Sequence, residues 1–191
     1  VINGGGRVRV YDWSSGEFWN FQRFPARAVL DYSGEFWEEQ AFPDIVETSF
    51  GLLGNSIDLS SNGSILAVGS RGTFGLGRVQ IFREVVGEGW LEDDGTGLVG
   101  EQDSDSFGDS ISLSSDGDIL AIGAPQNSEY GDGSGMVKVL QYDVPSSTWI
   151  QQGTNIGGSS PDANFGLAVA LSANGSRVVG GAPKALFNGA L

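Results

Sequence analysis

The chain has 191 residues with 39% hydrophobic residues, five Trp and eleven Phe, so it can bury a core and is not a disordered polymer. A formal net charge of −14, spread along the chain, argues against nucleic acid or an anionic membrane surface as partner, because both attract Lys and Arg. The lack of Cys excludes disulfides and thiolate metal sites, and the lack of His removes the commonest general base and the usual zinc ligand. No apolar run approaches the length needed to span a bilayer, and the 31 glycines indicate many turns.

The N-terminal segment contains a predicted strand and a short duplication. Residues 6–11 (GRVRVY) alternate apolar and basic side chains with a period of two, which predicts a β-strand. Residues 14–19 (SSGEFW) are nearly repeated at residues 32–37 (YSGEFW), so Trp19 and Trp37 compete for one position in a repeat. The offset of 18 residues is too short for a whole sheet, and we predict an extra hairpin inserted here.

Three copies of a two-stranded unit follow along the chain. The copies at 107–125 (FGDSISLSSDGDILAIGAP) and 165–183 (FGLAVALSANGSRVVGGAP) are clear, and the copy at 53–70 (LGNSIDLSSNGSILAVGS) is weaker. In each copy an alternating strand meets an apolar strand at an Asx-Gly corner, namely Asn62-Gly63, Asp116-Gly117 and Asn174-Gly175. This dipeptide is typical of a type I′ turn, in which both central residues have positive φ. We therefore predict a tight hairpin at each corner.

Each hairpin is followed by a third strand and then by a Trp. Residues 77–82 (GRVQIF) and 135–140 (GMVKVL) match residues 6–11 and alternate in the same way. Trp90 lies 13 residues after Gly77, and Trp149 lies 14 residues after Gly135. This spacing places each Trp on an outermost fourth strand.

The corner glycines Gly63, Gly117 and Gly175 are 54 and 58 residues apart, which sets the length of the repeat. Four short strands per repeat, with no sustained helical period, predict an all-β fold and a β-propeller built of four-stranded blades. A sandwich would not repeat at a near-constant period, and a β-solenoid repeats at a shorter one. The chain holds about three blades, fewer than the usual four to eight, so we expect it to be part of a larger ring.

We expect one propeller domain with four parts. Residues 1–49 form a partial first blade, with its third and fourth strands and the inserted hairpin; residues 50–106 and 107–164 form whole blades; residues 165–191 form the first two strands of a last blade. In a closed propeller such terminal pieces complete one shared blade. The chain begins VINGGG with no initiator Met, so we expect a mature product or an excerpt of a longer chain.

The repeated residues resemble the FG-GAP repeat, the blade of integrin α-subunit propellers and of many secreted or surface proteins. Its signature lies at Phe107-Gly108 with Gly123-Ala124-Pro125, and again at Phe165-Gly166 with Gly181-Ala182-Pro183. The weak copy begins with Leu53-Gly54 and lacks Ala-Pro at its end. The resemblance covers most of the chain from about residue 50, and it implies a propeller used for recognition, usually outside the cell.

In integrin-like members of this family, the corner between the first two strands is a calcium loop with carboxylates at alternating positions before the glycine. This chain offers Ser112, Ser114 and Asp116 and then Asp118, and serine hydroxyls are poor substitutes for the hard carboxylate ligands of calcium. The other corners are no richer, with Asp58, Ser60 and Asn62, and with Ala170, Ser172 and Asn174. We therefore predict plain hairpins without a cofactor. The calcium candidates that remain are Asp103, Asp105, Asp116 and Asp118.

Acidic residues gather just before the first complete Phe-Gly, where EQDSDSFGDS holds Glu101, Asp103, Asp105 and Asp109, and LEDDG pairs Asp93 with Asp94. Such clusters can hold a hard cation, and a glycosidase would need two carboxyls that converge in a cleft. Spacing alone indicates neither, so solvated loop charge is the simpler interpretation for an acidic chain.

Two sequons and four repeated aromatic residues have both structural and functional interpretations. Asn62-Gly63-Ser64 and Asn174-Gly175-Ser176 make Asn62 and Asn174 glycosylation candidates, although Asn-Gly also suits a turn. The aromatic residues recur at fixed repeat positions, which favours packing over carbohydrate stacking; they are Trp90, Trp149, Phe107 and Phe165.

These features favour a non-enzymatic recognition or adhesion module of a cell-surface or secreted protein that binds a protein or glycan partner through its loops. The alternative is a structural repeat unit that joins copies of itself or other chains in an extracellular assembly or filament. A carboxylate-based hydrolase is the third hypothesis. Neither nucleic acid binding nor direct membrane insertion is expected.

Overall fold

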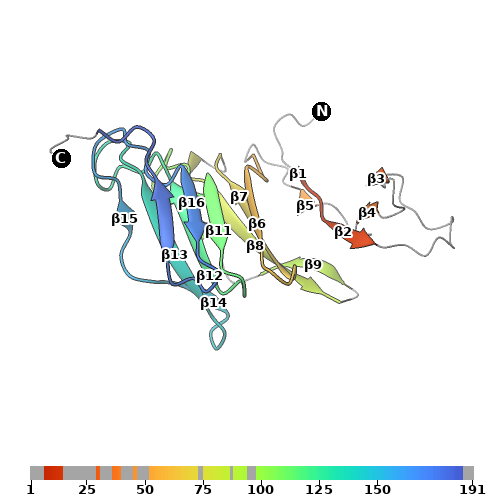
Figure 1. The fold of residues 1–191 in the computed structure, drawn as a ribbon. Coiled ribbons are helices and arrows are strands. Elements are labelled where there is room, and N and C mark those ends of the chain that lie inside the picture. The colour runs from red at the N-terminus through yellow and green to blue at the C-terminus, as the bar shows by residue number, and fades with distance from the viewer. Residues whose placement is uncertain are drawn as a thin grey trace.

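The computed structural model describes residues 7–14, 29–30, 36–39, 45–46, 52–72, 75–86, 88–93 and 98–186. Within these ranges the chain forms strands, turns and loops with no α-helix, and the strands pair in antiparallel sheets (Figure 1). The all-β expectation is therefore confirmed. The same ranges contain no helix long and apolar enough to cross a bilayer.

The strands fall into four groups in chain order. The N-terminal strand group comprises β1 (Arg7–Val8), β2 (Tyr11–Ser14), β3 (Val29–Leu30), β4 (Phe36–Glu39) and β5 (Ile45–Val46). Sheet I comprises β6 (Ser56–Leu59), β7 (Ile65–Ser70), β8 (Arg78–Val85), β9 (Gly89–Glu92) and β10 (Leu98–Val99). Sheet II comprises β11 (Ser110–Leu113), β12 (Ile119–Ala124), β13 (Met136–Asp143), β14 (Thr148–Gln151) and β15 (Ile156–Gly157). Sheet III comprises β16 (Ala168–Leu171) and β17 (Val178–Gly181).

Sheets I and II share one topology, an antiparallel meander whose fourth strand is broken. In sheet II the strands β11, β12, β13 and β14 are successive neighbours, and β15 pairs with the opposite end of β13 from β14. Sheet I repeats this arrangement, with β9 and β10 sharing the outer side of β8. The predicted Trp strand is therefore present, and a short second strand completes its edge.

The alternating strands build a core between sheets I and II. Cross-strand neighbours share a face, so the register of β11, β12 and β13 gathers one apolar face of sheet II. The core cluster contains Ile65, Ala67, Val79 and Ile81 from sheet I, and Phe107, Ile111, Leu113, Leu120, Ile122, Ala124, Met136 and Leu140 from the second repeat. Ala121, on the opposite face of β12, is also fully buried, because β16 of sheet III lies near that strand.

The other face of sheet I carries a second apolar cluster. Leu66 and Val68 of β7 pack there with Val8 of β1, together with Leu53 and Phe82. Leu66 and Val68 point away from Ile65 and Ala67 because side chains alternate along a strand. The N-terminal strand group thus lies on the side of sheet I that faces away from sheet II (Figure 1).

The first strands of the three repeats lie side by side. β11 is flanked by β6 on one side and by β16 on the other, and Figure 1 shows the three strands in the order β16, β11, β6. Successive sheets are therefore stacked face to face with equivalent strands in a row. The described residues do not form a closed ring, and the number of blades stays a prediction.

The N-terminal strand group repeats the outer part of sheet I. β1 pairs with β5 in the register in which β8 pairs with β10, and β2 pairs with β4 as β8 pairs with β9. This register puts Trp37 at the place of Trp90 in the backbone of the repeat, whereas Trp19 lies outside the described residues. β3, which pairs with β4, has no counterpart in sheets I and II.

The predicted type I′ turn is wrong at all three corners. Positive φ occurs at Gly63 (75°), Gly117 (79°) and Gly175 (66°), but not at the Asx residues before them. Each glycine N–H bonds back to the carbonyl of a serine three residues earlier, namely Ser60, Ser114 and Ser172. The corner is therefore a longer hairpin loop with one left-handed residue, a conformation that glycine adopts without strain.

Candidate functional site

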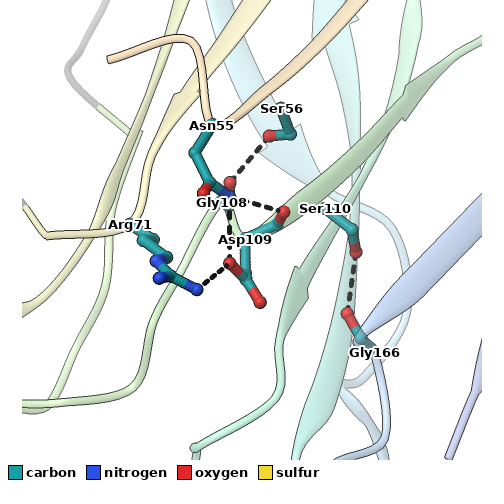
Figure 2. A network of polar contacts seen from close by, with 7 residues as sticks. All are labelled: Asn55, Ser56, Arg71, Gly108, Asp109, Ser110 and Gly166. Carbon is teal, nitrogen blue, oxygen red and sulfur yellow. Dashed lines mark hydrogen bonds and ion pairs between the residues drawn. The ribbon is translucent and has the colours of Figure 1, made fainter. Parts of the chain in front are cut away.

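The junctions between successive sheets carry a repeated hydrogen bond. Ser56 Oγ donates to the carbonyl oxygen of Gly108 at 2.7 Å, and Ser110 Oγ donates to that of Gly166 at 2.7 Å (Figure 2). Both serines stand in the first strand of one repeat, and both acceptors belong to the Phe-Gly pair of the next. The small polar residue of the first strand therefore fixes the next repeat in place.

The first glycine of Gly-Ala-Pro is required by the same junction. A Cβ at Gly123 would overlap the carbonyl oxygen of Gly166 and the hydroxyl of Ser110, and a Cβ at Gly69 would overlap those of Gly108 and Ser56. The backbones approach too closely for any side chain. In this chain the motif glycines mark packing between repeats.

A polar network closes one end of the junction between sheets I and II. Asn55 Nδ2 donates to Asp109 Oδ1 at 2.9 Å, and Arg71 Nη1 lies 3.3 Å from the same oxygen (Figure 2). The Asp109 side chain is 8% exposed and the Arg71 side chain is 49% exposed, so the pair is only partly shielded from solvent. Asp109 thus joins the second repeat to the first through its contacts with Asn55 and Arg71.

Side chains of the first strands also satisfy the backbone of the next first strand. Asp58 Oδ2 accepts from the Leu113 N–H at 2.7 Å, while its Oδ1 accepts from the Leu59 N–H at 2.9 Å. One junction later, Ser112 Oγ accepts from the Leu171 N–H at 3.1 Å. The side chains of Asp58 and Ser112, at calcium-loop positions, thus point toward the first strand of the next sheet. That strand lies at the edge of its sheet, and these oxygens accept hydrogen bonds from backbone N–H groups that have no partner on that side among the described strands.

The corners themselves are closed by their own side chains. In the first corner, Asn62 Oδ1 accepts from Ser60 Oγ at 2.8 Å and from the Ser64 N–H at 3.1 Å, while Ser60 Oγ accepts from the Ile65 N–H at 3.0 Å. The other two corners repeat this arrangement around Asp116 and Asn174. In each corner, one side-chain oxygen of the Asx residue and the serine hydroxyl are thus engaged in hydrogen bonds within the turn.

At the Asx position of the three corners, Asp116 is acidic whereas Asn62 and Asn174 are neutral amides. Hydrogen bonds from the Ser114 hydroxyl and then from the Asp118 N–H stabilise its charged form and lower the pKa of the Asp116 carboxyl. The Asp118 backbone carbonyl accepts from the Tyr142 N–H at 2.8 Å, which joins the corner to β13. These two calcium candidates lie together in the second corner, without a third carboxylate.

The other two calcium candidates, Asp103 and Asp105, have different surroundings. Asp103 is exposed, whereas Asp105 is 2% exposed and its Oδ2 accepts from Asn127 Nδ2 at 2.9 Å and from the Gln102 N–H at 3.2 Å. Across the described ranges, no three Asp or Glu side chains converge as a metal-binding group. The four candidates are therefore not brought together.

The remaining acidic residues of the two clusters are drawn to basic partners. Glu101 pairs with Lys138 of β13, and Asp93 Oδ2 accepts from Arg83 Nε at 3.0 Å; Asp94 lies outside the described residues. The Arg83 guanidinium also lies over the ring of Tyr142, 4.2 Å from its centroid, and so connects sheet I to sheet II. The acidic stretch is thus dispersed among separate contacts.

Three of the four repeated aromatic residues pack in or against the cores. Phe107 is 2% exposed in the core cluster between sheets I and II, Trp149 packs against that cluster, and Trp90 packs against the second cluster. Phe165 is half-buried beside sheet III. Phe107, Trp149 and Trp90 therefore contribute to the packing of the two core clusters.

A feature that the sequence analysis missed is the loop 126–134, which joins β12 to β13. Tyr130 at its tip is 45% exposed, and its hydroxyl donates to the Asn155 carbonyl oxygen at 2.9 Å. Asn155 Nδ2 also donates to Glu129 Oε2 at 2.7 Å, so Asn155 bonds to two adjacent residues of the loop, Glu129 and Tyr130. The signal in the sequence is length, since Gly135 follows Gly123 by 12 positions whereas Gly77 follows Gly69 by 8.

The two glycosylation candidates are accessible at their corners. Asn62 and Asn174 are both exposed, and in each the side-chain oxygen is the hydrogen-bonded atom. The amide nitrogen, to which a glycan would be attached, has no hydrogen bond of its own among these contacts. Both sequons remain chemically open to modification.

No protein-family model matches this chain, and no curated protein matches it. The resemblance to FG-GAP repeats therefore remains an expectation from the repeated residues, and the structure contributes the all-β architecture and the geometry of the junctions.

Proposed function

We propose that this chain is part of an FG-GAP-like β-propeller and acts as a non-catalytic recognition or adhesion module of a secreted or cell-surface protein. The propeller is supported by face-to-face sheets whose first strands lie in a row. It is supported further by the Phe-Gly and Gly-Ala-Pro glycines, which meet at each junction.

The observation that carries recognition is the loop 126–134 with Tyr130 at its tip. Asn127 anchors the loop base through Asp105, and Asn155 fixes the tip, so little conformational entropy is lost when a partner binds. A half-exposed tyrosine offers apolar area with a polar end, which suits a protein or glycan partner.

Non-catalytic function is supported by the engagement of the carboxylates. Asp109, Asp93 and Glu101 each pair with a cationic side chain, and Asp105 is buried against Asn127. A glycosidase needs two carboxyls facing a shared cleft, one of them protonated near neutral pH. The module binds its partner without a cofactor in this proposal.

The test is a binding assay of the immobilised protein against a panel of oligosaccharides and extracellular proteins, with and without EDTA. Tyr130→Ala should weaken the selected interaction about tenfold or more, as expected for an exposed aromatic anchor. Tyr130→Phe keeps the ring but loses the hydrogen bond to Asn155, so it should weaken binding less than Tyr130→Ala does. Val144→Ala is a control at an exposed side chain on another loop. Equal binding by Tyr130→Ala, or loss of binding in EDTA, would contradict the proposal.

The hydrolase alternative has its own assay. Chromogenic glycosides should not be hydrolysed by the purified protein, and Asp103→Asn should have no effect on the background rate. Activity that disappears in Asp103→Asn or Asp105→Asn would show that the protein is an enzyme.

A further inference from the structure

The two ends of the described fold are complementary halves of one repeat. The N-terminal strand group supplies a third strand with part of a fourth, because β1 pairs with β5 in the register of β8 with β10. Sheet III supplies a first and a second strand, because β16 pairs with β17 in the register of β11 with β12. Among the described strands, none lies beside the outer edge of β17 or the inner edge of β1.

Each end also exposes apolar side chains that are buried elsewhere in the repeat. Ile57 and Leu59 of β6 are 58% and 47% exposed, whereas their counterparts in sheet II, Ile111 and Leu113, are 8% and 7% exposed. Val179 of β17 is 67% exposed, whereas the equivalent residue of β12, Ala121, is fully buried. Among the described strands, none covers these side chains as the neighbouring sheet covers their counterparts.

A groove with a volume of about 360 Å³ runs beside Ile57 and Leu59, and its walls include Val8, Val10 and Leu66. At the equivalent place between sheets I and II, Ile65 and Ala67 of β7 fill the space in front of Ile111 and Leu113. The repeat therefore identifies what fits the groove, namely a second strand of the β7 type. In this chain the strand of that type with an open face is β17.

We propose that a second copy of this chain docks its β16–β17 hairpin into the groove of the first. β1 of the first copy then pairs with β17 of the second, with Val8 opposite Gly181 and Val10 opposite Val179. Sheets I and II define this register, since Val79 faces Gly69 and Val137 faces Gly123. The inference rests on the propeller arrangement of the proposed function.

The hydrogen bonds of the two ends fit this docking. In the junctions within the chain, the Leu113 and Leu171 N–H groups each need an oxygen from the preceding sheet. The equivalent N–H of Leu59 already donates a hydrogen bond to Oδ1 of Asp58, the preceding residue. A docked second copy therefore does not have to supply an oxygen for this N–H. The residue that would face it from the second copy is Ala170, which offers none.

The hairpin cannot reach the groove of its own chain. β16 lies on one side of β11 and β6 lies on the other, and the groove opens on the far side of sheet I, beside the N-terminal strand group (Figure 1). The contact is therefore head-to-tail between copies, and repetition of it gives a ring or a filament.

The first measurement is mass by sedimentation equilibrium over a range of concentrations. We expect an average mass above the 20.0 kDa of one chain that rises with concentration. Val179→Lys should raise the dissociation constant about tenfold or more, because the contact would bury an unpaired charge. Val86→Lys, at a side chain that is 98% exposed in the turn between β8 and β9 and does not line the groove, is the matched control and should change nothing.

A second variant should strengthen the contact. Ala168 stands where Ser56 and Ser110 donate to the next repeat, and in the docked pair it would face the Gly54 carbonyl. Ala168→Ser should restore this hydrogen bond and tighten association about threefold to tenfold. Non-specific association through exposed apolar side chains would not become tighter when an alanine is replaced by the more polar serine.

Cross-linking fixes the polarity and the register. The chain has no Cys, so Val10→Cys and Val179→Cys each carry a single thiol. A mixture of the two proteins should form the mixed disulfide, because directly opposed residues of paired strands lie within disulfide reach. A constant mass of 20.0 kDa, or disulfides confined to identical variants, would overturn the inference. Val179→Lys should leave binding through Tyr130 unchanged, so failure of self-association and failure of the proposed recognition are separate results.

Discussion

Ser110 of β11 donates a hydrogen bond to the carbonyl oxygen of Gly166, 2.7 Å away, and so fastens sheet III to sheet II. Ser56 and Gly108 stand in the same relation one repeat earlier. The recurrence shows that a first-strand serine is part of the repeat and explains why the strand carries small polar residues on one face.

Ser110→Ala should therefore destabilise the protein. The change leaves a buried carbonyl without its donor, which costs about 1–3 kcal/mol. Urea unfolding followed by tryptophan fluorescence measures the loss. Ser159→Ala, at an exposed position, should stay within about 0.5 kcal/mol of the parent protein, as surface changes do.

Gly123→Ala should be more harmful than Gly63→Ala, although both remove a glycine. At Gly123 the new methyl group would overlap the Gly166 carbonyl and force the sheets apart, at a cost of about 3 kcal/mol. At Gly63 there is open space, and the cost is that of a left-handed alanine, about 1 kcal/mol. Equal unfolding free energies for the two variants would refute the close approach of the sheets.

The repeat period and the strands could be predicted from the sequence because alternation, corner glycines and Trp recur in phase. The turn type could not, since Asn-Gly alone favours type I′. The competing signal was the serine two residues before each Asx, at Ser60, Ser114 and Ser172, whose hydroxyl bridges the Asx oxygen and the next strand. A side-chain bond of this kind selects a longer loop over the tighter turn.

The fate of the acidic stretch could not be predicted either, because its partners are distant in sequence. Asp109 is held by Arg71, which precedes it by 38 residues, and Glu101 is held by Lys138, which follows it by 37. Such pairs depend on the stacking of the sheets, which no local pattern encodes. Tyr130 was missed for a related reason, since its role depends on Asn155 beyond the next two strands.

Asp116→Asn should be tolerated and should change the response to acid. The folded state lowers the pKa of this carboxyl, so the ionised group stabilises the fold above its unfolded pKa of about 3.9, and that contribution disappears as pH falls through the folded value. Asparagine fills the same position at Asn62 and Asn174 without titrating. The difference in unfolding free energy between parent and variant should be constant above about pH 5 and should move in favour of the variant below about pH 4. The change in this free-energy difference with pH should be small because the Asp116 carboxylate is exposed. The Asp118→Asn variant, which also removes one carboxylate from this corner, is the control.

Phe107 and Phe165 provide a matched pair for testing the core. Both occupy the Phe of Phe-Gly, but Phe107 is 2% exposed between two sheets, whereas Phe165 is half-buried beside sheet III. Phe107→Ala should cost about 3–5 kcal/mol, as cavity-forming Phe changes do, and Phe165→Ala should cost clearly less because water already reaches the ring. Phe107→Leu should be milder, since the first repeat carries the buried Leu53 at this position. If the two alanine variants unfold at the same urea concentration, the two aromatic side chains are equally buried and the asymmetry between sheets II and III is wrong.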